Sequence, residues 1–170
     1  MQRLCLSLLV AGLLVPAVAL AANSGSKDGT LVVRNADAKV YIWKANGTVY
    51  GRLASGKLII DDSNPIDENE PEVYGAEQVL PDYNDEGMVT YSGKGIRFRF
   101  FGGGYTIRIQ GTGINLSAVG RGSAKLTGMG TPLDGDYGDF AVNGGKPQPL
   151  SAFQTTVTFP PPPTVTTTTP

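Results

Sequence analysis

The chain has 170 residues and a formal net charge of −1, because 14 basic residues nearly balance 15 acidic ones. It contains no histidine and a single cysteine, which excludes Ser-His-Asp and Cys-His catalytic systems and makes the usual thiolate and imidazole zinc sites very improbable. A near-neutral charge also argues against nucleic acid as a partner, since nucleic-acid binders carry a dominant basic surface.

The N-terminal segment has the pattern of a secretory signal. Arg3 gives a positive start, residues 4–15 are apolar, and Ala19-Leu20-Ala21 supplies the small-x-small site of a signal peptidase. The apolar stretch is shorter than the roughly 20 residues that a membrane-spanning helix needs. We therefore expect residues 1–21 to be removed on export. The mature chain would then have no membrane span and no cysteine, because Cys5 lies within the signal.

Two blocks of the mature chain repeat every nine residues, and inside each unit apolar residues alternate with polar ones. The units of the first block begin at Gly29, Ala38, Gly47 and Gly56. The units of the second block, with the alternation moved by one place, begin at Gly95, Gly104, Gly113 and Gly122. The last unit fits poorly, since Lys125 stands where an apolar residue is expected. Alternation with period two is typical of half-buried strands, and glycine allows a sharp turn between them.

This rhythm predicts one all-β domain over residues 28–145. We favour an antiparallel two-sheet sandwich or barrel of about eight to ten short strands, joined by turns at the glycines. The alternative is a β-solenoid in which each nine-residue unit forms half a coil. The units lack the aspartate that calcium-binding nonapeptide solenoids place after their glycines, which counts against that family.

Charge is distributed unevenly along the domain. Residues 61–86 hold ten acidic side chains and no lysine or arginine, whereas residues 87–133 hold six basic side chains and no acid. The acidic segment contains prolines and a short predicted strand near Val73 to Leu80. Beyond Gly145 we expect two further elements. Thr155 to Phe159 has the pattern of a short strand, and residues 146–170 as a whole form a Pro/Thr-rich tail.

Two sets of side chains are candidates for ligand binding. Arg97, Arg99 and Arg108 occupy the polar phase of the second block, so we expect them to share one solvent face that could meet an anionic polymer. A solvated sheet face is the simpler interpretation, because outward positions of half-buried strands are usually charged. Tyr41 and Trp43 could stack on sugar rings, but Tyr41 shares its phase with Val32 and Ile59, which favours packing in or near the core.

Metal and catalytic interpretations have less support. Asp61, Asp62 and Asp67 are close enough in sequence to be calcium-ligand candidates, yet their spacing does not fit the EF-hand series. The acids crowd into one segment, and no strand offers an apolar pocket that would raise the pKa of one carboxyl for glycoside hydrolysis. We therefore expect no cofactor and no enzymatic activity, with a carboxylate-only hydrolase as the third hypothesis.

One resemblance can be added. The run from Gly95 to Phe100, the run from Gly111 to Gly122 and the opening Asp28 to Val33 resemble small exported proteins of actinobacterial type, over roughly residues 28–145. That group has no assigned activity, so the resemblance implies a bacterial, secreted or envelope location and transfers no site residues. The leading expectation is a non-enzymatic structural or interaction domain, whose partner is a cell-wall polymer or another envelope protein. The alternative is a dedicated carbohydrate- or anionic-polymer-binding module.

Overall fold

The computed structural model of the protein describes residues 28–65, 70–132 and 135–160. The predicted signal sequence with Cys5, the calcium candidate Asp67 and the chain from residue 161 onward lie outside the described residues.

All regular structure in these ranges is β-strand, without a helix, so the all-β prediction is confirmed. The described strands belong to a single antiparallel sheet. They are β1 (Gly29–Asp62), β2 (Glu72–Tyr74), β3 (Gln78–Asp82), β4 (Asp85–Gly128), β5 (Asp139–Val142), β6 (Gln148–Pro149) and β7 (Thr155–Phe159).

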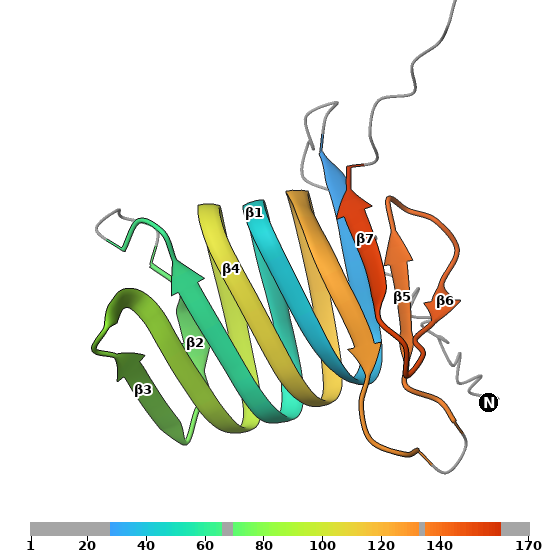
Figure 1. Ribbon diagram of the computed structural model, residues 1–170, viewed down its shortest axis with the longest axis horizontal. Coiled ribbons are helices and arrows are strands. Elements are labelled where there is room, and N and C mark those ends of the chain that lie inside the picture. The colour runs from blue at the N-terminus through green and yellow to red at the C-terminus, as the bar shows by residue number, and fades with distance from the viewer. Residues whose placement is uncertain (1–27, 66–69, 133–134, 161–170) are drawn as a thin grey trace, which may run out of the picture.

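The two long strands wind around each other as one coil (Figure 1). Most residues of β1 pair with two residues of β4: Val40, for example, pairs with both Ile109 and Leu126, which lie 17 residues apart in the chain. In the same way Ile109 pairs with both Val40 and Leu58, which lie 18 residues apart. A full turn therefore takes about two of the nine-residue units, and neighbouring turns come alternately from β1 and β4.

Glycine pairs form the corners of this coil. Gly47 lies opposite Gly120, and Gly56 lies opposite Gly111. At Gly47 and Gly120 the backbone φ angles are 136° and 137°, a region that side chains rarely adopt. A Cβ atom on either residue would also collide with the backbone of the facing strand. The corners thus explain the nine-residue spacing of Gly47 and Gly56 in β1 and of Gly111 and Gly120 in β4.

The predicted two-sheet sandwich or barrel of about eight to ten short strands is not confirmed. The structure has one open sheet, in which β1 and β4 are 34 and 44 residues long. The physical reason is that the glycines bend a strand without ending its pairing, so they act as corners and not as hairpin turns. The nine-residue half-turn matches the solenoid alternative in length, but here adjacent turns run antiparallel.

The core fills the inside of the coil. Alternate residues of β1 and β4 point inward, as the period of two predicts, and bury nearly all of their surface. The apolar residues that alternate within the units, such as Leu31 and Val40 in the first block and Ile107 and Ile109 in the second, are buried as this pattern predicts, whereas Gly51 at an inward position is half-buried. In the poorly fitting last unit Ala124 and Leu126 are buried and Lys125 lies outside. The buried apolar side chains on either side of the last corner, Ala118 and Ala124, are six residues apart, whereas those at the corner before it are five apart. The inward positions of the last unit are therefore shifted by one residue from those that the repeat predicts.

Short strands extend the sheet at both ends of the coil. At one end β2 and β3, from the acidic segment 61–86, pair with β4. At the other end β5 pairs with β1, and β7 pairs with the last turn of β4 (Figure 1). Phe159 and Leu150 are buried in the core. The sheet thus continues past residue 145, into the segment predicted as a tail, and β7 has the bounds predicted for it.

Candidate functional site

The outer surface of the coil carries the polar half of each strand and is hollowed in several places, and two of these open grooves combine cations with aromatic rings. Because nine residues make half a turn, strand segments nine residues apart lie on opposite layers of the coil (Figure 1), and their outward side chains therefore face opposite sides. Each groove runs across several neighbouring strands of one layer, and no residue lines both grooves.

The larger one, the arginine–tyrosine groove, has a volume of about 890 Å³. Its side chains come from β1, β2 and β4, which lie side by side in this layer. We define it by six outward residues: Tyr50, Arg52, Tyr74, Arg97, Arg99 and Phe101.

Two arginines face each other directly in this groove. Arg52 of β1 pairs with Arg97 of β4, and both side chains are exposed. Like charges placed opposite each other across strands destabilise a sheet. Within the described part of the chain neither guanidinium makes an ion pair. The carboxylate of Glu72 lies one strand over, opposite Arg99, so the groove keeps a positive excess.

Exposed aromatic rings flank these arginines. Tyr50 and Tyr74 are 50% and 61% exposed, which is unusual for rings of this size. The guanidinium carbon of Arg99 lies 4.1 Å from the centre of the Phe101 ring, a cation–π contact that orients the arginine. At the margin, Arg34 is 3.7 Å from Asp139 and is therefore partly neutralised. The groove combines cations with open ring faces.

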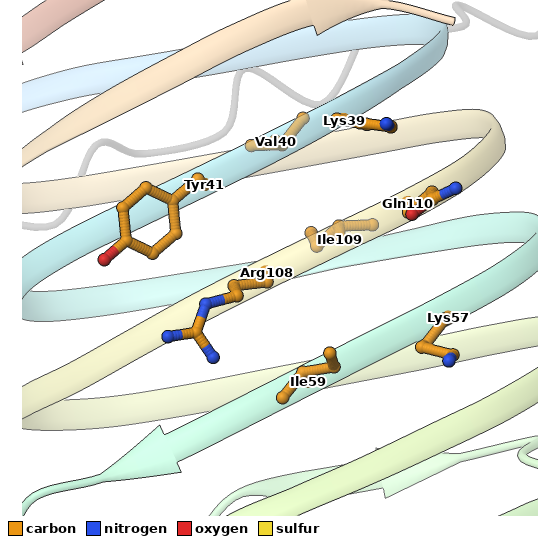
Figure 2. Close-up of a pocket in the computed structure, with 8 residues that line it drawn as sticks. All are labelled: Lys39, Val40, Tyr41, Lys57, Ile59, Arg108, Ile109 and Gln110. Carbon is orange, nitrogen blue, oxygen red and sulfur yellow. The ribbon is translucent and has the colours of Figure 1, made fainter.

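The second, the lysine–tyrosine groove, lies on the other layer and has a volume of about 330 Å³ (Figure 2). Figure 2 shows outward side chains along three adjacent strands, with Val40 and Ile109 on the inner side of the ribbon. No carboxylate lines it within the described residues. We define it by six outward residues: Lys39, Tyr41, Lys57, Ile59, Arg108 and Gln110.

Aromatic stacking supports one end of this groove. The rings of Tyr41 and Trp43 are stacked, with centres 5.3 Å apart. Arg108 lies 5.5 Å from the Tyr41 ring, and Lys125 lies 5.6 Å from the Trp43 ring. These two rings are half-buried on the outer surface. Of the expected packing in or near the core, a place in the core itself is excluded for Tyr41 and Trp43, because the inward positions are taken by their neighbours Val40 and Ile42.

The predicted arginine set is divided between the two grooves. Arg97 and Arg99 lie together in the arginine–tyrosine groove, as expected, but Arg108 lies in the other one. The expectation of one shared face is wrong because Arg99 and Arg108 are nine residues apart, which is half a turn of the coil. Two residues at the same position of neighbouring units both point outward, but they lie on opposite layers of the coil.

Asp61 and Asp62, the two calcium candidates within the described residues, do not converge. Asp61 and Asp62 are consecutive residues of β1, so their side chains point to opposite faces of the sheet. Asp62 is buried, and its carboxylate accepts a hydrogen bond of 2.9 Å from the backbone N–H of Asn64. In the part of the chain that the structure describes, no three potential metal ligands gather at one point.

The pKa of Tyr91 is displaced from its ordinary value. Burial raises the pKa of the Tyr91 hydroxyl above its ordinary value, and the nearby negative charge of Glu70 adds to the rise. Tyr91 pairs with Leu58 and Val79 and packs against the core, outside both grooves. Its displaced pKa therefore reflects its place in the sheet.

Several groove residues were missed from the sequence, among them Arg52, Tyr74 and the two lysines. A signal for some of them exists: Lys39 and Lys57 are 18 residues apart, as are Arg34 and Arg52, and one full turn brings such pairs onto the same layer. Tyr74 offers no comparable signal, because it lies in the short strand β2, outside the repeat.

In comparisons with known proteins, no protein-family model, no curated protein and no solved structure matches the chain. In the described ranges no helix has the length and apolar character to span a membrane. The class that the structure defines is an all-β coiled sheet with two basic, aromatic grooves on its outer surface.

Proposed function

We propose that the protein is an exported, non-enzymatic interaction module of the bacterial envelope or extracellular space, and that its arginine–tyrosine groove binds an anionic polysaccharide. The single observation that carries this proposal is the Arg52–Arg97 pair. Two guanidinium groups face each other without an ion pair among the described residues, and two exposed tyrosines adjoin them: Tyr74 lies opposite Arg97, and Tyr50 lies two residues before Arg52 on β1.

The chemistry of the groove fits such a ligand. Guanidinium groups form paired, charge-assisted hydrogen bonds with carboxylate, sulfate and phosphate oxygens. An anion between Arg52 and Arg97 would also remove their mutual repulsion. Tyr50 and Tyr74 can cover the apolar faces of sugar rings on either side, because an aromatic side chain offers a large rigid surface.

The shape of the groove favours a polymer over a small ligand. Small-molecule sites are usually enclosed and cover most of the ligand. This groove is open and crosses several strands, so it suits an extended chain that contacts a few units at a time. Among its lining residues Glu72 is the one carboxylate, so the groove lacks the pair of acids that glycoside hydrolysis requires. These features support the interaction hypothesis over the hydrolase hypothesis.

The test is a calorimetric titration of the purified protein with dextran sulfate, with polygalacturonate and with neutral dextran. We expect binding to the two anionic polymers that weakens with salt, as screened charge–charge contacts do. The double variant Arg52→Ala/Arg97→Ala should bind about tenfold or more weakly, which corresponds to about 1.4 kcal/mol.

A matched control removes the same charge elsewhere. Lys94 and Lys146 are exposed cations that line neither groove, and Lys94→Ala/Lys146→Ala should bind as the wild type does. If both double variants bind the polymers equally more weakly than the wild type, the loss of binding reflects net charge and not the groove. Tight binding that Arg52→Ala/Arg97→Ala leaves unchanged would refute the assigned groove, and capture of an envelope protein in place of any glycan would favour a protein partner.

A further inference from the structure

The lysine–tyrosine groove is a second basic, aromatic surface that the proposed function does not use. It lies half a turn from the arginine–tyrosine groove, on the other layer, and shares no lining residue with it. A ligand on one layer therefore leaves the other layer open. The core between the layers is filled with buried apolar side chains.

The cations of this groove form a row that crosses the strands. Lys39 and Lys57 both pair with Gln110, which lies between them on the neighbouring strand. The lysines are therefore two strand spacings apart, which is about 10 Å. Both side chains are exposed, and neither makes an ion pair among the described residues. This spacing lets each lysine meet a separate anionic group of one extended chain.

The rest of the groove can hold the sugar backbone between those charges. Arg108 lies one row away from the lysines, against the Tyr41 ring, and it also contacts the sulfur of Met88 at 3.9 Å. Ile59 gives an apolar patch next to it (Figure 2). The carboxylate of Asp61 follows two residues after Ile59 on the same strand and is not among the lining residues. The charge of the groove itself is wholly positive.

We propose that the lysine–tyrosine groove is a second site for the anionic polysaccharide, so that one molecule bridges two polymer segments, one on each layer of the coil. The nature of the ligand rests on the proposed function, whereas the second site is argued from its own residues. Two grooves facing away from each other cannot both contact one short stretch of a stiff chain. Bridging is therefore the expected result of filling both.

Trp43 gives this site a readout of its own. It is the single tryptophan of the chain and is stacked on Tyr41, a groove residue. Titration with dextran sulfate should change its fluorescence, and neutral dextran should not. The response should persist in Arg52→Ala/Arg97→Ala and should be lost, or need about tenfold more polymer, in Lys39→Ala/Lys57→Ala. The Lys94→Ala/Lys146→Ala variant should respond as the wild type does.

Bridging is measured by light scattering with long dextran sulfate. The wild type should cross-link the polymer at intermediate protein-to-polymer ratios, and each groove variant should bind without cross-linking. If Lys39→Ala/Lys57→Ala keeps both wild-type affinity and cross-linking, the second site is refuted. If instead Arg52→Ala/Arg97→Ala keeps its affinity while the lysine variant loses all binding, the proposed use of the first groove fails and the lysine–tyrosine groove is the single site, which overturns bridging.

Discussion

The inner and outer surfaces of the coil are built from alternate residues of the same two strands, yet they follow different rules. Inside, β1 and β4 present apolar side chains at almost every position, and both layers look alike. Outside, the two layers differ: one presents arginines between exposed tyrosines, and the other presents lysines beside a Tyr41–Trp43 stack. The difference teaches that the repeat specifies the fold through its inward residues and leaves the outward ones free for recognition.

The corner glycines should show the largest effect on stability. Gly120→Ala places a Cβ against the backbone of Asn46 and Gly47 at a φ of 137°, whereas Gly144 has a φ of 69°, which other residues can adopt, and open space around it. We expect Gly120→Ala to lower the free energy of unfolding by about 4 kcal/mol or more and Gly144→Ala by about 1 kcal/mol. Urea denaturation measures both. Equal losses would contradict the close approach of strands at the corner.

Neighbouring residues on β4 test the division between surfaces directly. Ile109 is 1% exposed and points inward, and Gln110 is exposed and points outward. Ile109→Ala should cost about 2–5 kcal/mol of unfolding free energy, because it leaves a cavity in the core. Gln110→Ala should change that free energy by no more than about 0.5 kcal/mol. A large cost for Gln110→Ala would mean that the outer layer is covered.

The inward surface could be predicted from the sequence because burial follows a local rule. Alternation with period two identified Leu31, Val40, Ile107 and Ile109 as inward residues, and all four are buried. The strand Thr155–Phe159 was predicted by the same reasoning. The alternation does not predict the coil, because a glycine that bends a strand and a glycine that ends one look the same in the sequence.

The candidate sites could be predicted in part for the same reason. Arg97 and Arg99 were placed together because they are two apart on one strand. The phase of the alternation predicts Arg108 on the same layer and does not point to Arg52, because the layer and the neighbouring strand depend on how many residues make a turn of the coil. That number follows from pairing between β1 and β4, which no local pattern contains.

Removing the arginine pair should separate recognition from stability. Arg52→Ala/Arg97→Ala eliminates a repulsive cross-strand pair, so its unfolding free energy at low salt should stay equal or rise by about 0.2–1 kcal/mol. The same variant should lose polymer binding at the arginine–tyrosine groove and keep the binding that the lysine–tyrosine groove provides. Thermal unfolding at low and high salt checks the stability part. A clear loss of stability would show that these arginines hold the sheet together.

The smallest expected effect concerns pH. The raised pKa of Tyr91 means that the folded protein keeps this proton at pH values where the unfolded chain has lost it. The contribution of protonated Tyr91 to the free energy of unfolding is therefore fully present below about pH 10, the ordinary tyrosine pKa, and is lost as the pH rises through the folded-state pKa. Above about pH 10, the free energy of unfolding of the Tyr91→Phe variant should fall less steeply with rising pH than that of the wild type. If the free energies of unfolding of the variant and the wild type change identically above about pH 10, Tyr91 does not cause the loss of stability there.

The most direct test of the division between a structural inside and a recognising outside is NMR shift mapping of the protein with a short dextran sulfate. The largest shift changes should fall on Tyr50, Arg52 and Arg97, with little change at the inward residues Val49 and Phe98, which lie beside them. Shift changes that neutral dextran reproduces, or that cluster on the edge strand β3 and leave the Arg52–Arg97 pair unaffected, would contradict the account.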